Sequence, residues 1–139
     1  MTTHPALLTQ LLDDEVEVAR SRLGDRATGI ERVSSTIRVP LSAPDGSPLL
    51  LVLDGSNFDA APFGVTVTEP DGSPAPLERW PAGLGASMHP VLNRPFVCVR
   101  GCAEYYSHPS HLQESWDTVR NTLRLAELLD HLLRRGGKP

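Results

Sequence analysis

The side chains that could do chemistry gather in one stretch of the chain, from His89 to Trp116. This stretch holds both cysteines, three of the five histidines and both tyrosines of the chain. A thiol close to imidazole and guanidinium groups has the surroundings that lower a cysteine pKa and make the sulfur nucleophilic. If the protein has a chemical site, the sequence places it in residues 89–116.

Cys98 is the candidate nucleophile of this stretch, with Arg94 and Arg100 close to it in the sequence. A histidine is suited to deprotonating an incoming amine, and an asparagine or histidine can stabilise the oxyanion that forms as an acyl group moves. The candidate catalytic residues are Cys98, His89, Asn93, His108 and His111. Cys102 is a weaker alternative nucleophile.

Two other interpretations of the same residues stay open. Cys98, Cys102, His108 and His111 form the set of ligands that a tetrahedral zinc site uses. Two ligands four residues apart on a strand would lie about 13 Å apart, so this site requires Gly101 to turn the chain. Alternatively, Cys98 is a small buried hydrophobe between Val97 and Val99, and the histidines are ordinary loop residues.

An α+β domain is expected to position this stretch. Residues 6–23 have one apolar stripe at helical spacing, with Pro5 at the start and Gly24 as the cap. Four strands are expected at residues 35–41, 49–53, 64–68 and 96–100. They would form an antiparallel meander, with the run LLLVL at 49–53 covered on both faces.

Two turns and one long loop connect these strands. The word PDGSP occurs at residues 44–48 and again at 70–74, and both copies predict a turn with a positive φ at the glycine. Residues 74–88 have no periodic pattern and are expected to form an irregular loop that Trp80 pins to the core. Ser110 and Gln113 fit a capping box, which predicts a helix over residues 112–135 that covers the sheet together with the first helix.

Composition narrows the classes of protein. A chain of 139 residues is expected to form a single domain, residues 1–139. Its net charge of −4, without a basic stripe, argues against nucleic acid as a partner. No secretory signal or membrane-spanning run is apparent, so we expect a cytoplasmic protein with no membrane partner. No pattern in the chain indicates a cofactor.

The order of these elements and their motifs resembles the ubiquitin-conjugating enzyme family, in particular its divergent bacterial members. His89-Pro90 stands where that family has the start of a His-Pro-Asn motif, and Val97-Cys98-Val99 stands where it has the catalytic cysteine segment. The third motif position is Val91 instead of asparagine, and the nearest asparagine is Asn93. The resemblance spans nearly the whole chain as an order of elements and is specific over residues 80–116.

This resemblance implies a function. Cys98 would accept the C-terminus of a ubiquitin-like protein as a thioester from a ThiF-like activating enzyme and pass it to an amine. The expected partners are therefore a ubiquitin-like protein and a ThiF-like activating enzyme. Two alternatives stay open at this point: a binding module of the same fold without catalysis, and a small acidic secretion chaperone.

Overall fold

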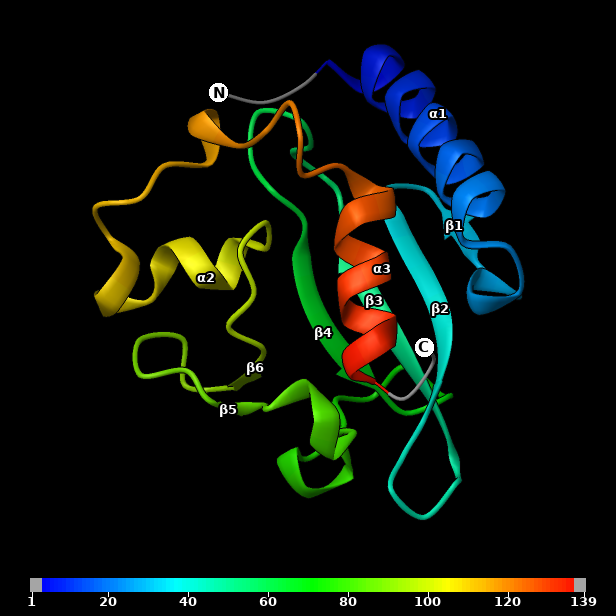
Figure 1. The fold of residues 1–139 in the computed structure, drawn as a ribbon, viewed down its shortest axis with the longest axis vertical. Coiled ribbons are helices and arrows are strands. Elements are labelled where there is room, and N and C mark those ends of the chain that lie inside the picture. Colours follow the sequence, from blue (N-terminus) through cyan, green and yellow to red (C-terminus); the bar gives the residue numbers. More distant parts are fainter. Residues whose placement is uncertain (1–3, 137–139) are drawn as a thin grey trace.

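The structure is a computed structural model that describes residues 4–136. A long helix, α1 (Pro5–Leu23), precedes an antiparallel sheet whose four strands follow one another in chain order (Figure 1). These strands are β1 (Glu31–Val33), β2 (Thr36–Ser42), β3 (Pro48–Asp54) and β4 (Gly64–Thr68). The elements that follow are β5 (Ser87–Met88), β6 (Pro95–Phe96), α2 (Ala103–Ser107) and α3 (Leu125–Arg135). The α+β class, with a helix at each end of a four-stranded antiparallel sheet, is confirmed.

The core lies between one face of the sheet and the two long helices. Helix α3 lies over the sheet, and α1 packs beside α3 (Figure 1). The inward side chains alternate along the strands and are almost fully buried: Ile37, Val39, Leu41, Leu49, Leu51, Leu53, Val65 and Val67. On the opposite face, Leu50 and Val52 are only half-buried. The expectation that the run at 49–53 is covered on both faces was wrong, because both helices pack on the same side.

The two PDGSP turns adopt the same conformation, as predicted. In the first, the Asp45 carboxylate accepts a hydrogen bond from the Ser47 backbone amide at 3.0 Å, and Gly46 has a φ of 86°. In the second, Asp71 accepts from the Ser73 amide at 2.9 Å, and Gly72 has a φ of 93°. The side-chain oxygen replaces a backbone acceptor, which is why aspartate precedes glycine in both turns.

The prediction of which strands form the sheet was wrong in one respect. The strand expected at 96–100 is not part of the sheet: Pro95–Phe96 pairs only with Ser87–Met88 as a separate two-stranded ribbon. The strand that completes the four-stranded sheet is instead β1, at the edge beside β2. A turn in which Ser34 has a positive φ of 56° connects β1 with β2. No glycine or asparagine marks this turn in the sequence, so the usual hairpin signal is missing.

The C-terminal helix begins at Leu125, not at Leu112 as expected. The capping box at Ser110 is wrong, because Pro109–His111 forms only a single 3₁₀ turn. Between this turn and α3, side chains tie the backbone to a distant segment: the Trp116 indole donates to the Asp59 carbonyl at 2.9 Å. Where this connection reaches α3, the Glu15 carboxylate of α1 accepts hydrogen bonds from the Arg124 guanidinium and from the Leu125 backbone amide. These tertiary contacts outweigh the helical spacing of the apolar residues.

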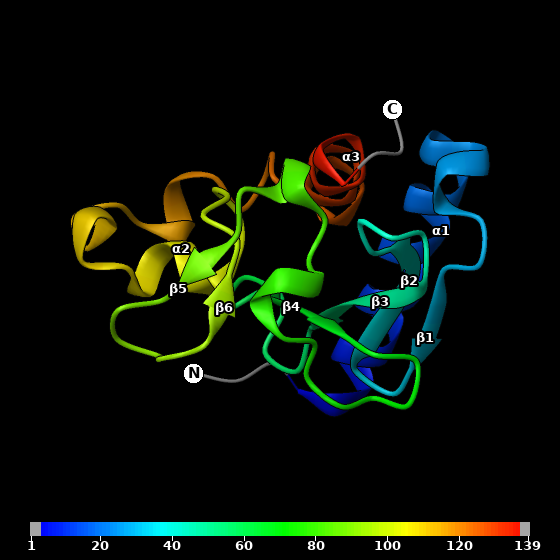
Figure 2. The ribbon, with the colours of Figure 1, turned by 90° about the horizontal axis from the view of Figure 1, so that it is seen from below.

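Residues 87–120 form a lobe beside the sheet, which we call the side lobe. It extends beyond the β4 edge, away from α1, in both ribbon views (Figures 1 and 2). The Ala103 amide donates to the Phe63 carbonyl at 2.8 Å and joins the start of α2 to the chain entering β4. The side lobe contains every candidate catalytic residue, so its internal contacts decide what the site can do.

Candidate active site

Cys98 is exposed at a sharp bend of the side lobe. Its neighbours Val97 and Val99 are both buried, and the Val99 amide donates to the Val97 carbonyl at 3.0 Å. This bond between residues two apart produces a tight turn with Cys98 at its centre. The two valines anchor the turn in the core and leave the thiol outside, so Cys98 is not the buried hydrophobe that one interpretation expected.

His111 is the histidine that reaches the thiol. Its Nε2 lies 3.4 Å from the Cys98 Sγ, and its Nδ1 lies 2.8 Å from an oxygen of the Glu114 carboxylate. An ionised carboxylate only accepts hydrogen bonds, so in the neutral imidazole Nδ1 carries the ring proton and Nε2 is the acceptor facing the thiol. Thiol, imidazole and carboxylate therefore form one hydrogen-bonded chain, Cys98–His111–Glu114.

Glu114 is held in place by two further side chains. The Tyr105 hydroxyl donates to its carboxylate at 2.8 Å, and the Arg100 guanidinium lies 3.3 Å away. The hydrogen bonds from Tyr105 and then from His111 lower the pKa of Glu114, so the carboxylate stays ionised. The Tyr105 ring also stacks on the His111 ring, with centroids 3.9 Å apart and planes 14° apart. The imidazole is thus fixed by a hydrogen bond at its edge and by an aromatic ring against its face.

The surroundings of Cys98 favour the thiol over the thiolate. Burial is the main cause that raises its pKa, the negative charge of Glu114 adds to this, and the positive charge of Arg135 opposes it. A thiol of raised pKa needs a base to become a nucleophile, and the Nε2 of His111 is in position for that role.

Arg135 approaches the site from the end of α3. Its Nε donates to the Gly83 carbonyl at 3.4 Å. A Cβ atom at position 83 would lie 1.9 Å from the Arg135 carbonyl oxygen, so only glycine allows this approach. The turn Ala82–Leu84 therefore docks against the end of α3 and holds Arg135, whose positive charge acts to lower the pKa of Cys98 against the larger effect of burial.

His89 lies in the side lobe but its ring is used for structure. It is 1% exposed, and its Nδ1 accepts hydrogen bonds from the Val91 and Leu92 amides at 3.1 and 3.0 Å. Its Nε2 lies 3.1 Å from both the Glu104 carbonyl and the Ser107 hydroxyl. Both ring nitrogens are occupied, so His89 joins the turn at residues 89–93 to α2 and has no nitrogen left for the thiol.

Asn93 and His108 also have local roles. Asn93 has a positive φ of 54°, and its amide closes the turn onto the His89 carbonyl at 2.9 Å. Within residues 4–136, its side chain makes no hydrogen bond to Cys98 or His111. His108 accepts from the Ser110 amide at 3.1 Å and caps the Pro109–His111 turn. Of the five predicted catalytic residues, the structure therefore joins Cys98 and His111 by a hydrogen bond. His108 lies beside them, with its ring centroid 5.7 Å from that of His111, and His89 and Asn93 have structural roles in their own turn.

The four potential zinc ligands do not converge. Cys102 is 1% exposed, and its thiol donates to the Val99 carbonyl at 3.0 Å, away from His111. Burial, followed by the charge of Glu104, raises the pKa of Cys102 to about 12, which makes this thiol a weaker nucleophile than an ordinary cysteine. Among the residues that the structure describes, no group of three potential ligands surrounds a common point.

Glu114 and Tyr105 were missed in the sequence. The signal for Glu114 was its position three residues after His111, which allows a histidine and a carboxylate on one turn to meet. Tyr105 offered no such signal, because its hydroxyl reaches Glu114 only through the fold of the side lobe. Both residues matter because they fix the tautomer and the plane of the imidazole.

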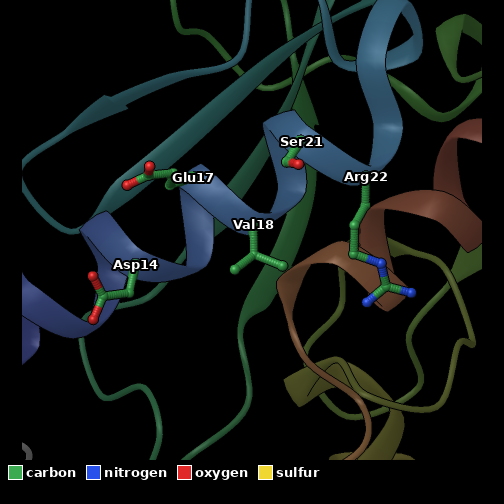
Figure 3. A pocket seen from close by; sticks show the side chains of 5 residues that line it. All are labelled: Asp14, Glu17, Val18, Ser21 and Arg22. Carbon is green, nitrogen blue, oxygen red and sulfur yellow. The ribbon is translucent and has the colours of Figure 1, made fainter.

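Two of the surface cavities formed by residues 4–136 have volumes of about 310 and 450 Å³, and two others have about 170 Å³ each. One of about 310 Å³ adjoins the Cys98–His111–Glu114 chain and is lined by Arg100, Tyr106, Gln113, Glu114, Ser115, Thr118 and Val119. Another of about 450 Å³ lies against α1, where Asp14, Glu17, Val18, Ser21 and Arg22 project from the helix (Figure 3). Only the first shares a residue with the candidate active site.

Comparisons with known proteins give no family. Neither a protein-family model nor a curated protein sequence matches the chain. None of the helices in residues 4–136 has the length and apolar character needed to cross a membrane. The function is therefore argued from the geometry of the site.

Proposed function

We propose that the protein is a thioester-forming acyl transferase of the ubiquitin-conjugating kind. Cys98 accepts the C-terminus of a ubiquitin-like protein from a ThiF-like activating enzyme and passes it to an amine. The observation that carries this proposal is the exposed Cys98 thiol 3.4 Å from the His111 Nε2. The order of elements and the His89-Pro90 motif before the cysteine segment support the same proposal.

His111 performs both proton transfers in this scheme. It takes the proton of the Cys98 thiol as the sulfur attacks the acyl carbon, and gives that proton to the leaving group of the activating enzyme. When an amine later attacks the thioester, His111 takes a proton from the amine and returns it to the departing Cys98 thiolate. Glu114 keeps the imidazole in the tautomer that presents an unprotonated Nε2. Residue 91 is valine where the resembled family has asparagine, and His89 supports the loop instead of touching the acyl group.

A thioester trap tests this function. The protein is mixed with a ThiF-like activating enzyme and a ubiquitin-like protein encoded beside it, with ATP and without reductant. We expect an adduct that thiols remove, absent from Cys98→Ser and retained in Cys102→Ala, because Cys102 is buried. An adduct that still forms in Cys98→Ser would overturn the assignment of the nucleophile. No adduct with any such pair would refute the conjugation function.

A binding module without catalysis is the second candidate, and one observation favours it. Burial raises the pKa of Cys98, as in an unreactive cysteine. In this case the ubiquitin-like protein binds with unchanged affinity to wild type and to Cys98→Ser, and no adduct forms. Titration calorimetry of both proteins, beside the thioester trap, separates the two functions.

A further inference from the structure

The contacts of Cys98, His111 and Glu114 suit a reaction that does not depend on a second protein. We propose that these three residues form a hydrolytic triad and that the protein cleaves peptidyl thioesters with water. The base that would deprotonate an amine is equally placed to deprotonate a water molecule, so acyl groups on Cys98 are released as carboxylic acids. This activity goes beyond conjugation and requires neither an activating enzyme nor ATP.

Acylation begins with the thiol proton. His111 Nε2 takes the proton from Cys98 Sγ, and the thiolate attacks the carbonyl carbon of the substrate thioester. The bond between the acyl carbon and the substrate sulfur breaks as the new bond to Sγ forms. The departing thiolate takes the proton from His111, which restores the neutral imidazole. No oxidant or reductant takes part.

Deacylation repeats these steps with water. His111 Nε2 takes a proton from water as the oxygen attacks the acyl carbon. The bond from that carbon to Sγ then breaks, and the proton on His111 returns to Sγ. The products are a carboxylic acid and the free Cys98 thiol, so the cycle closes with one water consumed for each thioester.

Glu114 is a positioning residue in this cycle. The charged imidazole of each intermediate lies 2.8 Å from its carboxylate, which itself accepts hydrogen bonds from Tyr105. The Tyr105 ring, 3.9 Å from the His111 ring, prevents the imidazole from turning its Nε2 away from the thiol. His111 is therefore more firmly positioned than a solvated surface histidine. Its ring is stacked on Tyr105, and the carboxylate that it contacts is itself bonded to a tyrosine and an arginine.

The oxyanion support points to thioesters in preference to amides. The Cys98 backbone amide makes no hydrogen bond within residues 4–136, and the charge of Arg135 acts on Cys98. One free amide and one nearby cation are modest stabilisation for a tetrahedral oxyanion. A thioester needs less, because its leaving thiolate departs without prior protonation, whereas an amide must lose an amine.

The neighbouring cavity indicates the class of acyl group. Its volume is about 310 Å³, and Glu114 and Arg100 belong to both the cavity and the active site. The Thr118 hydroxyl donates to the Ser115 carbonyl and the Ser115 hydroxyl accepts from the Asp117 amide, so the side-chain groups that remain for a ligand are those of Gln113 and Arg100. Amide groups of a peptide can form hydrogen bonds with these two side chains, whereas an alkyl chain cannot. A peptidyl acyl group therefore fits better than a fatty acyl group.

Purified protein and a synthetic acetyl-dipeptide thioester of mercaptopropionate test the proposal. Carboxylic acid release is followed by chromatography, and the acyl-enzyme by intact mass. We expect many turnovers for wild type and none for Cys98→Ser. His111→Gln should slow release about 10²- to 10⁴-fold, the usual contribution of a general base. His131→Gln is the matched control, since this exposed histidine of α3 lies outside the triad.

Glu114→Gln separates positioning from a structural role. We expect kcat to fall at least about tenfold with KM and the thermal midpoint unchanged, and Glu114→Asp to recover part of kcat. Three results would overturn the proposal: no turnover by wild type, turnover by Cys98→Ser, or an acyl-enzyme that never releases acid. An octanoyl thioester cleaved as fast as the peptidyl thioester would overturn the substrate class. The assay contains no activating enzyme, so its outcome is independent of the conjugation test.

Discussion

Cys98 and Cys102 are four residues apart and have opposite environments. Cys98 is exposed on a bend with a histidine beside it, whereas Cys102 is 1% exposed with its thiol directed at backbone carbonyls. Burial raises the pKa of both thiols, but His111 offers a route to the thiolate only at Cys98. We therefore expect Cys98 to be much more reactive than Cys102, although the two residues are close in the sequence.

Alkylation should modify Cys98 alone in the folded protein. The pKa of Cys102 is about 12, so its thiolate fraction at pH 8 is about 10⁻⁴ even before burial limits access. We expect one iodoacetamide adduct on wild type, none on Cys98→Ser and two on unfolded wild type. Intact mass and peptide mapping measure these numbers. Two adducts forming at similar rates on the native protein would contradict the burial of Cys102.

The types and spacing of residues identified two of the three members of the hydrogen-bonded chain Cys98–His111–Glu114. Cys98 and His111 were among the candidates because thiols and imidazoles are rare in this sequence. The role of Glu114 was not predicted, because one acidic residue among 17 is not distinctive until the fold places it beside His111. No sequence pattern shows the partners of His89, whose two ring nitrogens contact the Val91 and Leu92 amides, the Glu104 carbonyl and the Ser107 hydroxyl.

At the level of elements, Arg79 joins the two PDGSP turns. It follows the second turn and makes two hydrogen bonds to the Glu69 carboxylate, at 2.7 and 3.0 Å. Its other amino group reaches Asp45 at 3.5 Å and also contacts the Ser47 hydroxyl in the first turn. The irregular loop that begins at residue 74 is thus attached to both hairpin ends by one guanidinium group.

Arg79→Met should weaken the protein in a pH-dependent manner. The hydrogen bond from Arg79 lowers the pKa of Glu69 below its ordinary value of 4.5 in the folded state. A carboxyl group whose pKa is lowered on folding stabilises the folded state at pH values above its unfolded-state pKa. This stabilisation is lost as the pH falls through the folded-state pKa. We expect a lower thermal midpoint than wild type at pH 7 and a difference that narrows below about pH 4.

Arg38→Met is the control for this comparison. Arg38 is an exposed arginine of β2 whose ion-pair partner, Glu31, lies 3.9 Å away. Its removal should change the thermal midpoint little at any pH. A difference between Arg79→Met and wild type that stays constant from pH 7 to pH 3 would contradict the pairing with Glu69.

Glu104 connects α2 to the main sheet. Its side chain is buried, accepts a hydrogen bond from the Val65 amide of β4 at 2.9 Å and pairs with Arg94 at 2.8 Å. Burial is the largest influence on this carboxyl group and raises its pKa. A single side chain thereby joins the side lobe to the strand at the sheet edge.

Glu104→Ala should destabilise the protein by about 1–3 kcal/mol, because it leaves the Val65 amide buried without a partner. Glu104→Gln keeps an acceptor for that amide and should cost less. Urea unfolding of both variants measures the difference. In the wild type, the pKa of the Glu104 carboxyl group is raised on folding. The stability that this group contributes is therefore present at pH values below its unfolded-state pKa and is lost as the pH rises through its folded-state pKa. Equal stability of the two variants would contradict the role of the Val65 bond.

Elements with strong local signals were predicted well, and those fixed by distant contacts were not. The helix at 6–23 and both aspartate–glycine turns depend on neighbours in sequence, and the structure confirms them. The helix expected from Leu112 failed because Trp116 is anchored to Asp59, 57 residues earlier. The strand expected at 96–100 failed because a tight turn at Cys98 replaces the ladder.

At the scale of the whole molecule, the first helix, α1, packs against the last helix, α3. Ion pairs connect Arg22 with Glu127, Arg26 with Asp130 and Arg124 with Glu15 along this contact. Beneath them, apolar side chains of both helices join the sheet face in one buried cluster. The charged rim is partly solvated and contributes little, so the apolar cluster supplies most of the stability.

Leu129→Ala should destabilise the protein by about 2–5 kcal/mol. Leu129 is fully buried in the cluster, and truncation removes contacts and leaves a cavity. His131→Ala on the same helix is the control, because His131 is exposed and its removal should have a small effect. Denaturant unfolding of both variants gives the two values. A small loss for Leu129→Ala would mean that α3 does not complete the core.

Strand β1 has a consequence for how copies of the protein behave at high concentration. An edge strand carries unpaired backbone groups that a second chain can extend into a larger sheet, a common route to aggregation. Here that edge is only three residues long, Glu31–Val33, and two of the three residues carry charge. The ladder that a second copy could form along β1 is therefore short and would have to accommodate two charged side chains, Glu31 and Arg32, which protects this side of the sheet against edge-to-edge growth.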